Sequence, residues 1–281
     1  MGCTVSERAF EEYLAKRGIV PRYEELPNGI TQPVDYSFEI AGQTLRLDVK
    51  EWAPNGPHLG VGSFDPYEPV RDKINEGRKK FKQYKRRGEP CVLVLCHYGP
   101  QLIMLDAISI FGAMRGDLGW VFPFNSDTGV GDTSRTETKF LTGGSMIHRE
   151  KESYERVQNT TISAVAVLAS IRVRGRRVGI ALHRRKASAG RAFTLEETFT
   201  LLQELYSEDH SVEVEPRVVV YDNLEATVPL PQEFPDGPYD ERFGRHGDWL
   251  CRTYVGAELA AIESAEEEVG ILPDDPLGLR T

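Results

Sequence analysis

The chain has 281 residues and a formal net charge of −9, with 43 acidic against 34 basic side chains. This length can bury a large core and form one large domain or two. No apolar run approaches the length that spans a bilayer, and no charged-then-apolar leader begins the chain, so we expect neither a membrane partner nor export. Four cysteines make no disulfide framework at this size, which indicates free thiols and a cytoplasmic location.

The first third of the chain predicts a helix, a strand, a hairpin, a helix and a strand, in that order. Apolar residues at helical spacing end at Gly18, a common C-terminal stop, and residues 20–26 suggest the first strand. The hairpin covers residues 34–50. Residues 70–87 predict a basic helix, and the nearly continuous apolar run 91–97 is typical of a buried strand.

The hairpin carries two acidic side chains that we expect to face each other. Residues 34–40 and 43–50 alternate apolar and polar side chains around Ala41-Gly42. With these two residues as the loop, Asp35 lies directly opposite Asp48 on the polar face of the hairpin.

A loop moved by one residue at each end sets Asp35 opposite Lys50 instead, still on that face. Two carboxylates held about 5 Å apart repel each other unless a positive charge lies between them. A divalent metal ion is the natural candidate, because Mg²⁺ takes oxygen ligands from one or two carboxylates. The alternative is an ordinary solvated polar face of a half-exposed hairpin.

The rest of the chain predicts further α/β structure without an internal repeat. The expected elements are a buried helix over 102–114, a short strand over 119–124, a long loop over 125–148, a core helix over 161–171, an amphipathic helix over 194–206 and a strand over 212–221. We therefore expect a core over residues 1–124 and a C-terminal elaboration or accessory region over residues 125–281, which the sequence allows to be packed in the same domain.

The negative net charge is unevenly distributed. Residues 71–87 hold nine Lys or Arg against two acids, residues 172–191 hold eight and no acid, and residues 258–275 hold seven acids and no base. A basic face can bind nucleic-acid phosphates while an acidic helix faces solvent, although a solvated surface is the alternative for both basic runs. The candidate phosphate-binding residues are Lys79, Lys82 and Arg86 in the first run and, after an apolar strand-like stretch in the second, Arg184, Arg185 and Lys186.

The motifs and their order resemble the PD-(D/E)xK nuclease superfamily, which has the restriction-endonuclease-like fold. Pro33-Val34-Asp35 is similar to the family's PD with one residue inserted, and Asp48-Val49-Lys50 is similar to its (D/E)xK. The resemblance covers residues 5–97 and implies an α/β fold, with a central mixed sheet flanked by helices and a C-terminal α/β elaboration. The first helix resembles that of archaeal Holliday-junction resolvases, through Glu7-Arg8, Phe10, Leu14 and Arg17-Gly18-Ile19.

The resemblance implies a metal-dependent nuclease that hydrolyses phosphodiester bonds of DNA, with RNA as substrate and a homodimer as assembly left open. Asp35, Asp48 and Glu7 would hold Mg²⁺ or Mn²⁺ together with the Val49 carbonyl. Lys50 would orient the attacking water and stabilise the developing negative charge.

Two matters stay open at this point. Glu7 also fits the N3 position of a capping box that begins at Thr4, in which case Glu11, one turn later, is the substitute ligand. The biological role could be restriction, repair, recombination or phage defence. The leading alternative function is a nuclease-fold module that binds nucleic acid or protein without catalysis, and the third is an unrelated phosphate-handling α/β protein.

Overall fold

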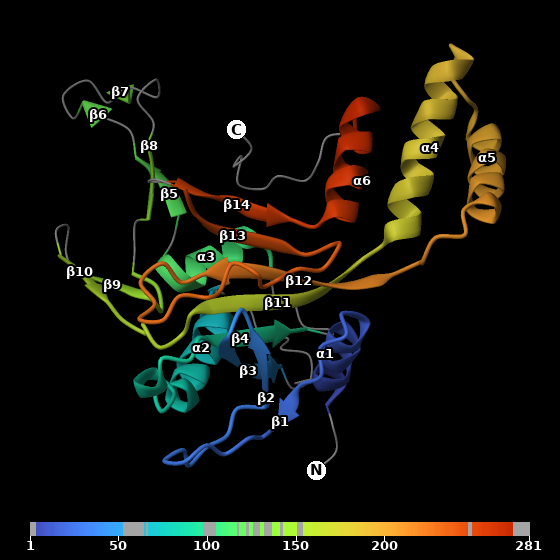
Figure 1. Cartoon of the computed structure of the whole chain (residues 1–281). Helices are drawn as coiled ribbons and strands as arrows, with labels where there is room; N and C mark the ends of the chain where they lie inside the picture. The colour runs from blue at the N-terminus through green and yellow to red at the C-terminus, as the bar shows by residue number, and fades with distance from the viewer. Residues whose placement is uncertain are drawn as a thin grey trace, which may run out of the picture. The chain divides into compact units, whose positions relative to one another are not determined.

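The chain forms an α/β structure with a mixed eight-stranded sheet flanked by helices (Figure 1). This computed structural model describes residues 4–52, 65, 67–97, 105–116, 118–121, 124–125, 130–131, 137–140, 143–150, 154–246 and 249–271. The chain divides into two compact units, each discontinuous in sequence. The hairpin unit comprises Val20–Val167 and Tyr221–Phe234, and the terminal unit comprises Met1–Ile19, Leu168–Val220 and Pro235–Thr281. The boundary predicted at residue 124 falls within the hairpin unit.

The strand order of the sheet is β1-β2-β3-β4-β11-β12-β13-β14. Strand β2 pairs antiparallel with β1 and β3, whereas β3, β4 and β11 run parallel. Parallel neighbours need a crossover connection, and helix α2 supplies the one between β3 and β4. The strands are β1 (Arg22–Tyr23), β2 (Tyr36–Ile40), β3 (Gln43–Glu51), β4 (Cys91–Cys96), β11 (Ala164–Ile171), β12 (Glu215–Asp222), β13 (Glu241–His246) and β14 (Trp249–Val255).

The predicted hairpin is confirmed, and so is its two-residue loop. Ile40 pairs with Gln43, and the register continues to Tyr36 opposite Leu47. Ala41 and Gly42 both have positive φ, 48° and 74°, which is the backbone of a type I′ turn. This turn matches the right-handed twist of the strands and therefore sets the register of the whole hairpin.

The predicted basic helix is confirmed as α2 (Glu68–Phe81), followed by a 3₁₀ turn (Lys85–Arg87) that ends at Gly88. Its buried residues recur at helical spacing and pack against β4. A Cβ atom at Gly77 would lie 3.0 Å from Leu93 Cδ1, so helix and strand approach closely at this position. The buried side of the helix and the turn is formed by Val70, Ile74, Gly77, Phe81 and Tyr84.

The hairpin unit also contains α3 (Ala107–Arg115), which confirms most of the predicted buried helix; residues 102–104 lie outside the described residues. The region predicted as one long loop over 125–148 contains short strands, so that prediction is wrong in part. Isolated strands of two to four residues leave little periodic signal in a Gly- and Thr-rich sequence. The strand pairs are β5 (Leu118–Val121) with β8 (Glu137–Phe140), β6 (Phe124–Asn125) with β7 (Val130–Gly131), and β9 (Ile147–Glu150) with β10 (Tyr154–Val157).

The terminal unit contains the remaining helices: α1 (Val5–Lys16), α4 (Val173–Ala189), α5 (Leu195–Glu208) and α6 (Ala257–Glu268). The predicted first helix and the predicted amphipathic helix are confirmed as α1 and α5. Each begins with a complete capping box, at Thr4 and at Thr194.

Two sequence predictions in the second half of the chain are wrong. The core helix expected over residues 161–171 is the buried strand β11, which runs parallel to β4. The strand-like stretch before Arg184 is part of helix α4, whose Ile180 packs against Ile262 of α6. Short apolar runs do not distinguish a buried strand from a buried helix by periodicity, which explains both errors.

Asp240 is a buried charge that joins three segments of the terminal unit. Its carboxylate accepts hydrogen bonds from the Tyr13 hydroxyl at 2.6 Å, from Arg17 at 3.3 Å, and from the backbone N–H groups of Val218 and Gly237, each at 2.8 Å. Burial and the Asp240 charge raise the pKa of Tyr13 well above its ordinary value. Because every one of these groups is engaged within the fold, we assign this cluster a structural role.

Two expectations from composition concern the described residues. Cys91, Cys96 and Cys251 are free thiols, as expected. Burial raises the pKa of the Cys91 thiol well above its ordinary value, so this cysteine is a poor nucleophile. No helix in the described part of the chain combines the length and the apolarity required to cross a membrane.

Candidate functional site

Four charged side chains meet on one face of the β2–β3 hairpin, and we call Asp35, Asp48, Lys50 and Lys80 the carboxylate–lysine cluster. Lys80 Nζ lies 2.5 Å from Asp48 Oδ1 and 3.2 Å from Asp35 Oδ1. Lys50 Nζ lies 2.8 Å from the other oxygen of Asp48, Oδ2. Two carboxylates and two ammonium groups therefore form a compact cluster of zero net charge.

The hairpin register brings the two carboxylates together. Continuing the pairing one residue beyond Tyr36 and Leu47 sets Asp35 opposite Asp48, as the sequence predicts. In an antiparallel ladder that starts from a hydrogen-bonded Ile40–Gln43 pair at a two-residue loop, alternation makes this a non-hydrogen-bonded position, the kind at which opposed residues lie closer together. Val49 N–H donates to Asp35 Oδ2 at 2.7 Å and orients that carboxylate.

Lys80 is the member of the cluster that sequence reasoning missed. The adjacent Lys79 and Lys82 were predicted to bind phosphates, yet it is Lys80 that turns toward the hairpin. Lys80 lies three residues after buried Gly77 and four before buried Tyr84, so it shares the inward face of the basic segment. This spacing is the sequence signal that could have identified it.

The polar face of the hairpin is covered at Asp48 and Arg46, whereas Glu39 at its turn end is exposed. Asp48 has no exposed surface and Arg46 is 3% exposed. The Arg46 guanidinium donates to Glu25 and to Glu89, each at 2.7 Å, and lies 5.2 Å from the ring centre of Tyr84. The alternative of an ordinary solvated polar face is therefore wrong for Arg46 and Asp48.

Burial and mutual repulsion shift the acidity of the cluster. Burial, together with the negative charge of Asp48, raises the pKa of Asp35 to about 6, although Lys80 and the Val49 N–H oppose the shift. Burial lowers the pKa of Lys80, but the charges of Asp48 and Asp35 outweigh it and raise that pKa overall. Lys80 is therefore a firmly protonated cation between two acids at neutral pH.

The residues present fit a divalent metal ion. Asp35 Oδ1 and Asp48 Oδ1 already converge on a single cation, the Lys80 ammonium. Asp48 Oδ2 is buried and accepts no hydrogen bond among the described residues, although the Lys50 charge lies beside it. No group of three or more Asp, Glu, His or Cys that could hold a metal occurs within the described ranges. Two carboxylates are nevertheless a usual protein contribution to Mg²⁺, whose other ligands are water and substrate oxygens.

Glu7 occupies the N3 position of a capping box in the terminal unit. Its carboxylate accepts the Thr4 N–H at 2.6 Å, and its own N–H donates to Thr4 Oγ1 at 3.1 Å. The capping-box alternative is therefore confirmed. Asp35 and Asp48 belong to the hairpin unit, whereas Glu7 and Glu11 belong to the terminal unit, so a metal-binding role for either glutamate stays a prediction.

The outer face of α2 and of the turn after it is basic. Lys79, Lys82 and Arg86 are exposed and form no ion pair among the described residues. Their charges are therefore available to an anionic partner. The helix that delivers Lys80 to the cluster thus also presents cations to solvent.

The second basic run is largely neutralised within the terminal unit. Helix α4 contributes Arg176, Arg177 and Arg184, which pair with three glutamates of α6, namely Glu266 at 2.5 Å, Glu258 at 3.0 Å and Glu268 at 2.9 Å. The expectation that the acidic helix faces solvent is wrong in part, because three glutamates of α6 pair with α4, although Glu258 and Glu268 also remain exposed. Arg185 and Lys186 form no ion pair among the described residues.

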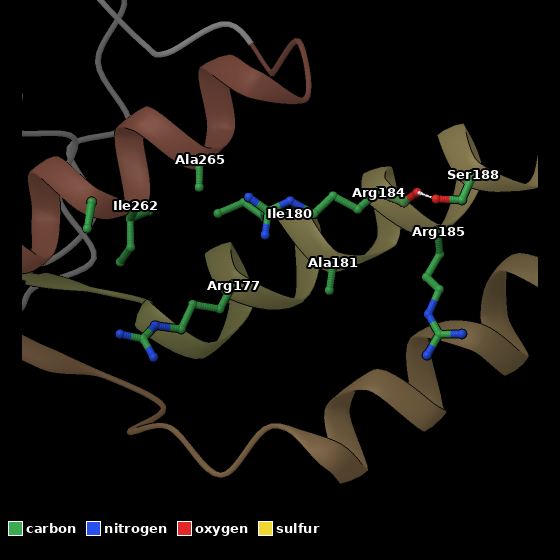
Figure 2. A pocket seen from close by; sticks show the side chains of 9 residues that line it. Arg177, Ile180, Ala181, Arg184, Arg185, Ser188, Ile262 and Ala265 are labelled. Carbon is green, nitrogen blue, oxygen red and sulfur yellow. Dashed lines mark hydrogen bonds between the residues drawn. The ribbon is translucent and has the colours of Figure 1, made fainter.

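A pocket of about 530 Å³ lies between α4 and α6. Figure 2 shows Ile180 of α4 on the side of Ile262 and Ala265 of α6, and three arginines of α4 also line the pocket. Ser188 donates to the Arg184 carbonyl at 2.9 Å. The lining contains no carboxylate, histidine or cysteine. The pocket therefore offers no acid–base or metal chemistry, and the carboxylate–lysine cluster is the stronger candidate site.

The cluster itself is the feature of the molecule that points to a function. Its charged side chains are partly or fully buried, and both carboxylates point at one cation position. Ion pairs on a protein surface rarely combine these properties. Comparison with known proteins adds nothing to this, because no family model, no curated protein and no solved structure matches the chain significantly.

Proposed function

We propose that this protein is a metal-dependent nuclease that hydrolyses phosphodiester bonds of DNA at the carboxylate–lysine cluster. The observation that carries the proposal is the convergence of Asp35 and Asp48 on one cation position beside Lys50. The order of hairpin, helix α2 and parallel strand β4 supports a restriction-endonuclease-like core.

Asp35 and Asp48 would hold Mg²⁺, for which Mn²⁺ can substitute. The Val49 carbonyl is a further oxygen on the same side, because the N–H and C=O of a strand residue point the same way and its N–H meets Asp35. When bound, the ion would lower the pKa of a water ligand and neutralise charge on the phosphate.

Lys50 would assist the hydrolysis from its place beside Asp48. Its ammonium is held beside Asp48, in a site where the carboxylate is fully buried and charges are weakly screened. Hydrolysis forms a P–O bond to water and breaks the bond to the leaving sugar oxygen. A preorganised ammonium stabilises the negative charge that builds up on phosphate oxygens during this exchange.

Lys79, Lys82 and Arg86 would bind the DNA backbone. They are exposed residues of α2 and of the turn after it, the segment whose inward side carries Lys80, so the proposed substrate contacts lie close in sequence to the cluster. Phosphate contacts of this kind give binding that is independent of base sequence and sensitive to salt.

The direct test is to incubate the purified protein with plasmid, linear duplex, branched DNA and RNA, each with Mg²⁺, Mn²⁺ or a chelator. We expect metal-dependent cleavage of DNA that is lost in Asp48→Ala. Glu39→Ala is the matched control, because Glu39 is an exposed acid of the same hairpin. Cleavage that survives in Asp48→Ala, or no cleavage of any substrate, would overturn the proposal.

One observation favours a second candidate, a nucleic-acid-binding module without catalysis. The cluster is already neutral, because Lys50 and Lys80 balance the two carboxylates. A scaffold that no longer binds metal would keep such an internal ion network for stability. DNA binding without cleavage, and without any effect of divalent ions on thermal stability, would favour this second function.

A further inference from the structure

We infer that Lys80 is the built-in counter-cation of Asp35 and Asp48, and that a divalent metal ion binds there only by displacing it. The inference rests on the proposed function, because it concerns the cation position of the same site. It deepens that proposal by naming a residue that governs how readily the site accepts metal.

Lys80 already occupies the cation position between the two carboxylates. Its Nζ lies within 3.2 Å of one oxygen from each carboxylate, in the position from which both are reached at once. A Mg²⁺ ion bound to these oxygens at about 2.0–2.1 Å would occupy the same space. The ammonium and the ion therefore compete for one position.

Asp48 is more deeply buried than the lysine that contacts it. Asp48 has no exposed surface, whereas the Lys80 side chain is 27% exposed. Lys80 therefore reaches from partial contact with solvent to a buried oxygen of Asp48. Removing Lys80 from this place opens the carboxylate, and the flexible four-carbon stem of a lysine allows such a movement without a change in the helix.

The net charge of the site depends on whether Lys80 leaves when the ion binds. With Lys80 in place, the cluster is neutral, and adding a divalent ion would give a net charge of about +2 in a partly buried site, which is costly. Exchanging Lys80 for the ion gives about +1, the charge that one phosphodiester group neutralises. Electrostatics thus favour exchange over addition, and they favour metal binding when the substrate is present.

The first test compares Lys80→Met with Lys79→Met. Methionine keeps the length and loses the charge, and Lys79 is the exposed neighbour on the same helix. Calorimetric titration with Mn²⁺ should show Lys80→Met binding on the order of tenfold tighter than the wild type, with Lys79→Met unchanged. The Mn²⁺-induced rise in melting temperature should likewise be larger in Lys80→Met.

The second test uses the unaltered protein, so it holds even if Lys80→Met folds poorly. Acetylation by an amine-reactive ester is followed residue by residue with mass spectrometry, in chelator and in Mn²⁺. Lys80 should react severalfold faster in Mn²⁺, because its ammonium is released, and Lys79 serves as the internal reference. Unchanged or slower labelling of Lys80 in Mn²⁺ overturns the inference.

The two proposals fail in different ways. If the wild type and Lys80→Met bind Mn²⁺ equally and Asp48→Ala abolishes binding, the metal site stands and only the role of Lys80 is refuted. If neither protein binds Mn²⁺, with or without a short DNA duplex, both the metal site and the inference are refuted.

Discussion

Asp48 and Lys80 are 32 residues apart in the chain and form the closest contact of the carboxylate–lysine cluster, 2.5 Å between Oδ1 and Nζ. One comes from the middle of β3 and the other from the last turn of α2. Their pairing ties the helix to the hairpin and fills the position between the two acids with a positive charge. This one contact therefore links the stability of the hairpin unit to the chemistry that we propose for it.

Replacing Asp48 by alanine should abolish cleavage and also destabilise the protein in chelator. The change leaves Lys50 and Lys80 without the buried carboxylate that they share, a loss of about 1–3 kcal/mol in unfolding free energy. Urea denaturation in chelator measures the loss. A variant as stable as the wild type would show that the two lysines gain equivalent partners or hydration once Asp48 is removed.

Lys50→Ala separates catalysis from stability more cleanly. Lys50 is partly exposed, and within the described part of the chain its ion pair is with Asp48 Oδ2, the oxygen that accepts no hydrogen bond there. We expect cleavage to fall by about 100-fold or more, as for the loss of an electrostatic catalytic group, while the melting temperature changes little. Lys73→Ala is the control, because Lys73 pairs with Glu76 on the same protein unit away from the hairpin. Full cleavage in Lys50→Ala would remove Lys50 from the proposed mechanism.

The stability of the protein should depend on pH through Asp35. Its folded-state pKa of about 6 is higher than the ordinary value near 4, so folding favours its protonated form. The contribution of Asp35 to stability is therefore fully present below about pH 4 and is lost as the pH rises through about 6. Denaturation of the wild type and Asp35→Asn across this range should show that the asparagine variant lacks this loss. Parallel curves for the two proteins would contradict the raised pKa.

DNA affinity should fall steeply with salt, and the exposed basic residues of α2 and of the turn after it should account for much of the dependence. Reversing Lys79, Lys82 and Arg86 to glutamate should weaken binding to all sequences alike. The slope of log affinity against log salt should become shallower by about three. Fluorescence anisotropy at several salt concentrations measures both effects, and an unchanged slope would mean that DNA does not contact this face.

The corresponding reversal on α4, of Arg184, Arg185 and Lys186, tests the second predicted phosphate surface. Arg184 already pairs with Glu268, so its charge is partly neutralised, whereas Arg185 and Lys186 form no ion pair among the described residues. We expect a smaller loss of DNA affinity than for the α2 variant. An equal or larger loss would identify α4 as the main phosphate-binding helix.

Substitutions of Glu7 can distinguish its role in helix capping from a role in metal binding. Glu7→Gln should leave the melting temperature nearly unchanged, because glutamine serves equally at the N3 position, whereas Glu7→Ala should cost about 0.3–1.5 kcal/mol in unfolding free energy. If the resemblance of this helix to the resolvases holds, Glu7→Gln should still reduce cleavage and raise the metal concentration required. Loss of activity in Glu11→Gln alone would move the ligand by one turn.

The local sequence determined the hairpin and several helix ends. The alternation of apolar and polar residues around Ala41-Gly42 predicts the register of the hairpin, and the observed pairing confirms it. Both loop residues have positive φ angles, as the two-residue type I′ turn requires, and this turn fixes the register. Thr194 marks the start of α5 through an equally local interaction, because its side chain accepts a hydrogen bond from the N–H of Glu197, three residues later. These features depend on neighbours in sequence, so a single chain is enough to predict them.

Tertiary structure alone decided the rest. Residues 164–171 form a strand and not a helix because β4 offers a parallel partner, and a buried apolar run has no periodicity that reveals this. The acidic helix α6 pairs with α4 rather than with solvent because their charges are complementary across a shared apolar contact. Lys80 differs from Lys79 only in its angle around α2. The packing of α2 on the sheet, which depends on residues far apart in the chain, directs Lys80 toward Asp48 and leaves Lys79 exposed to solvent.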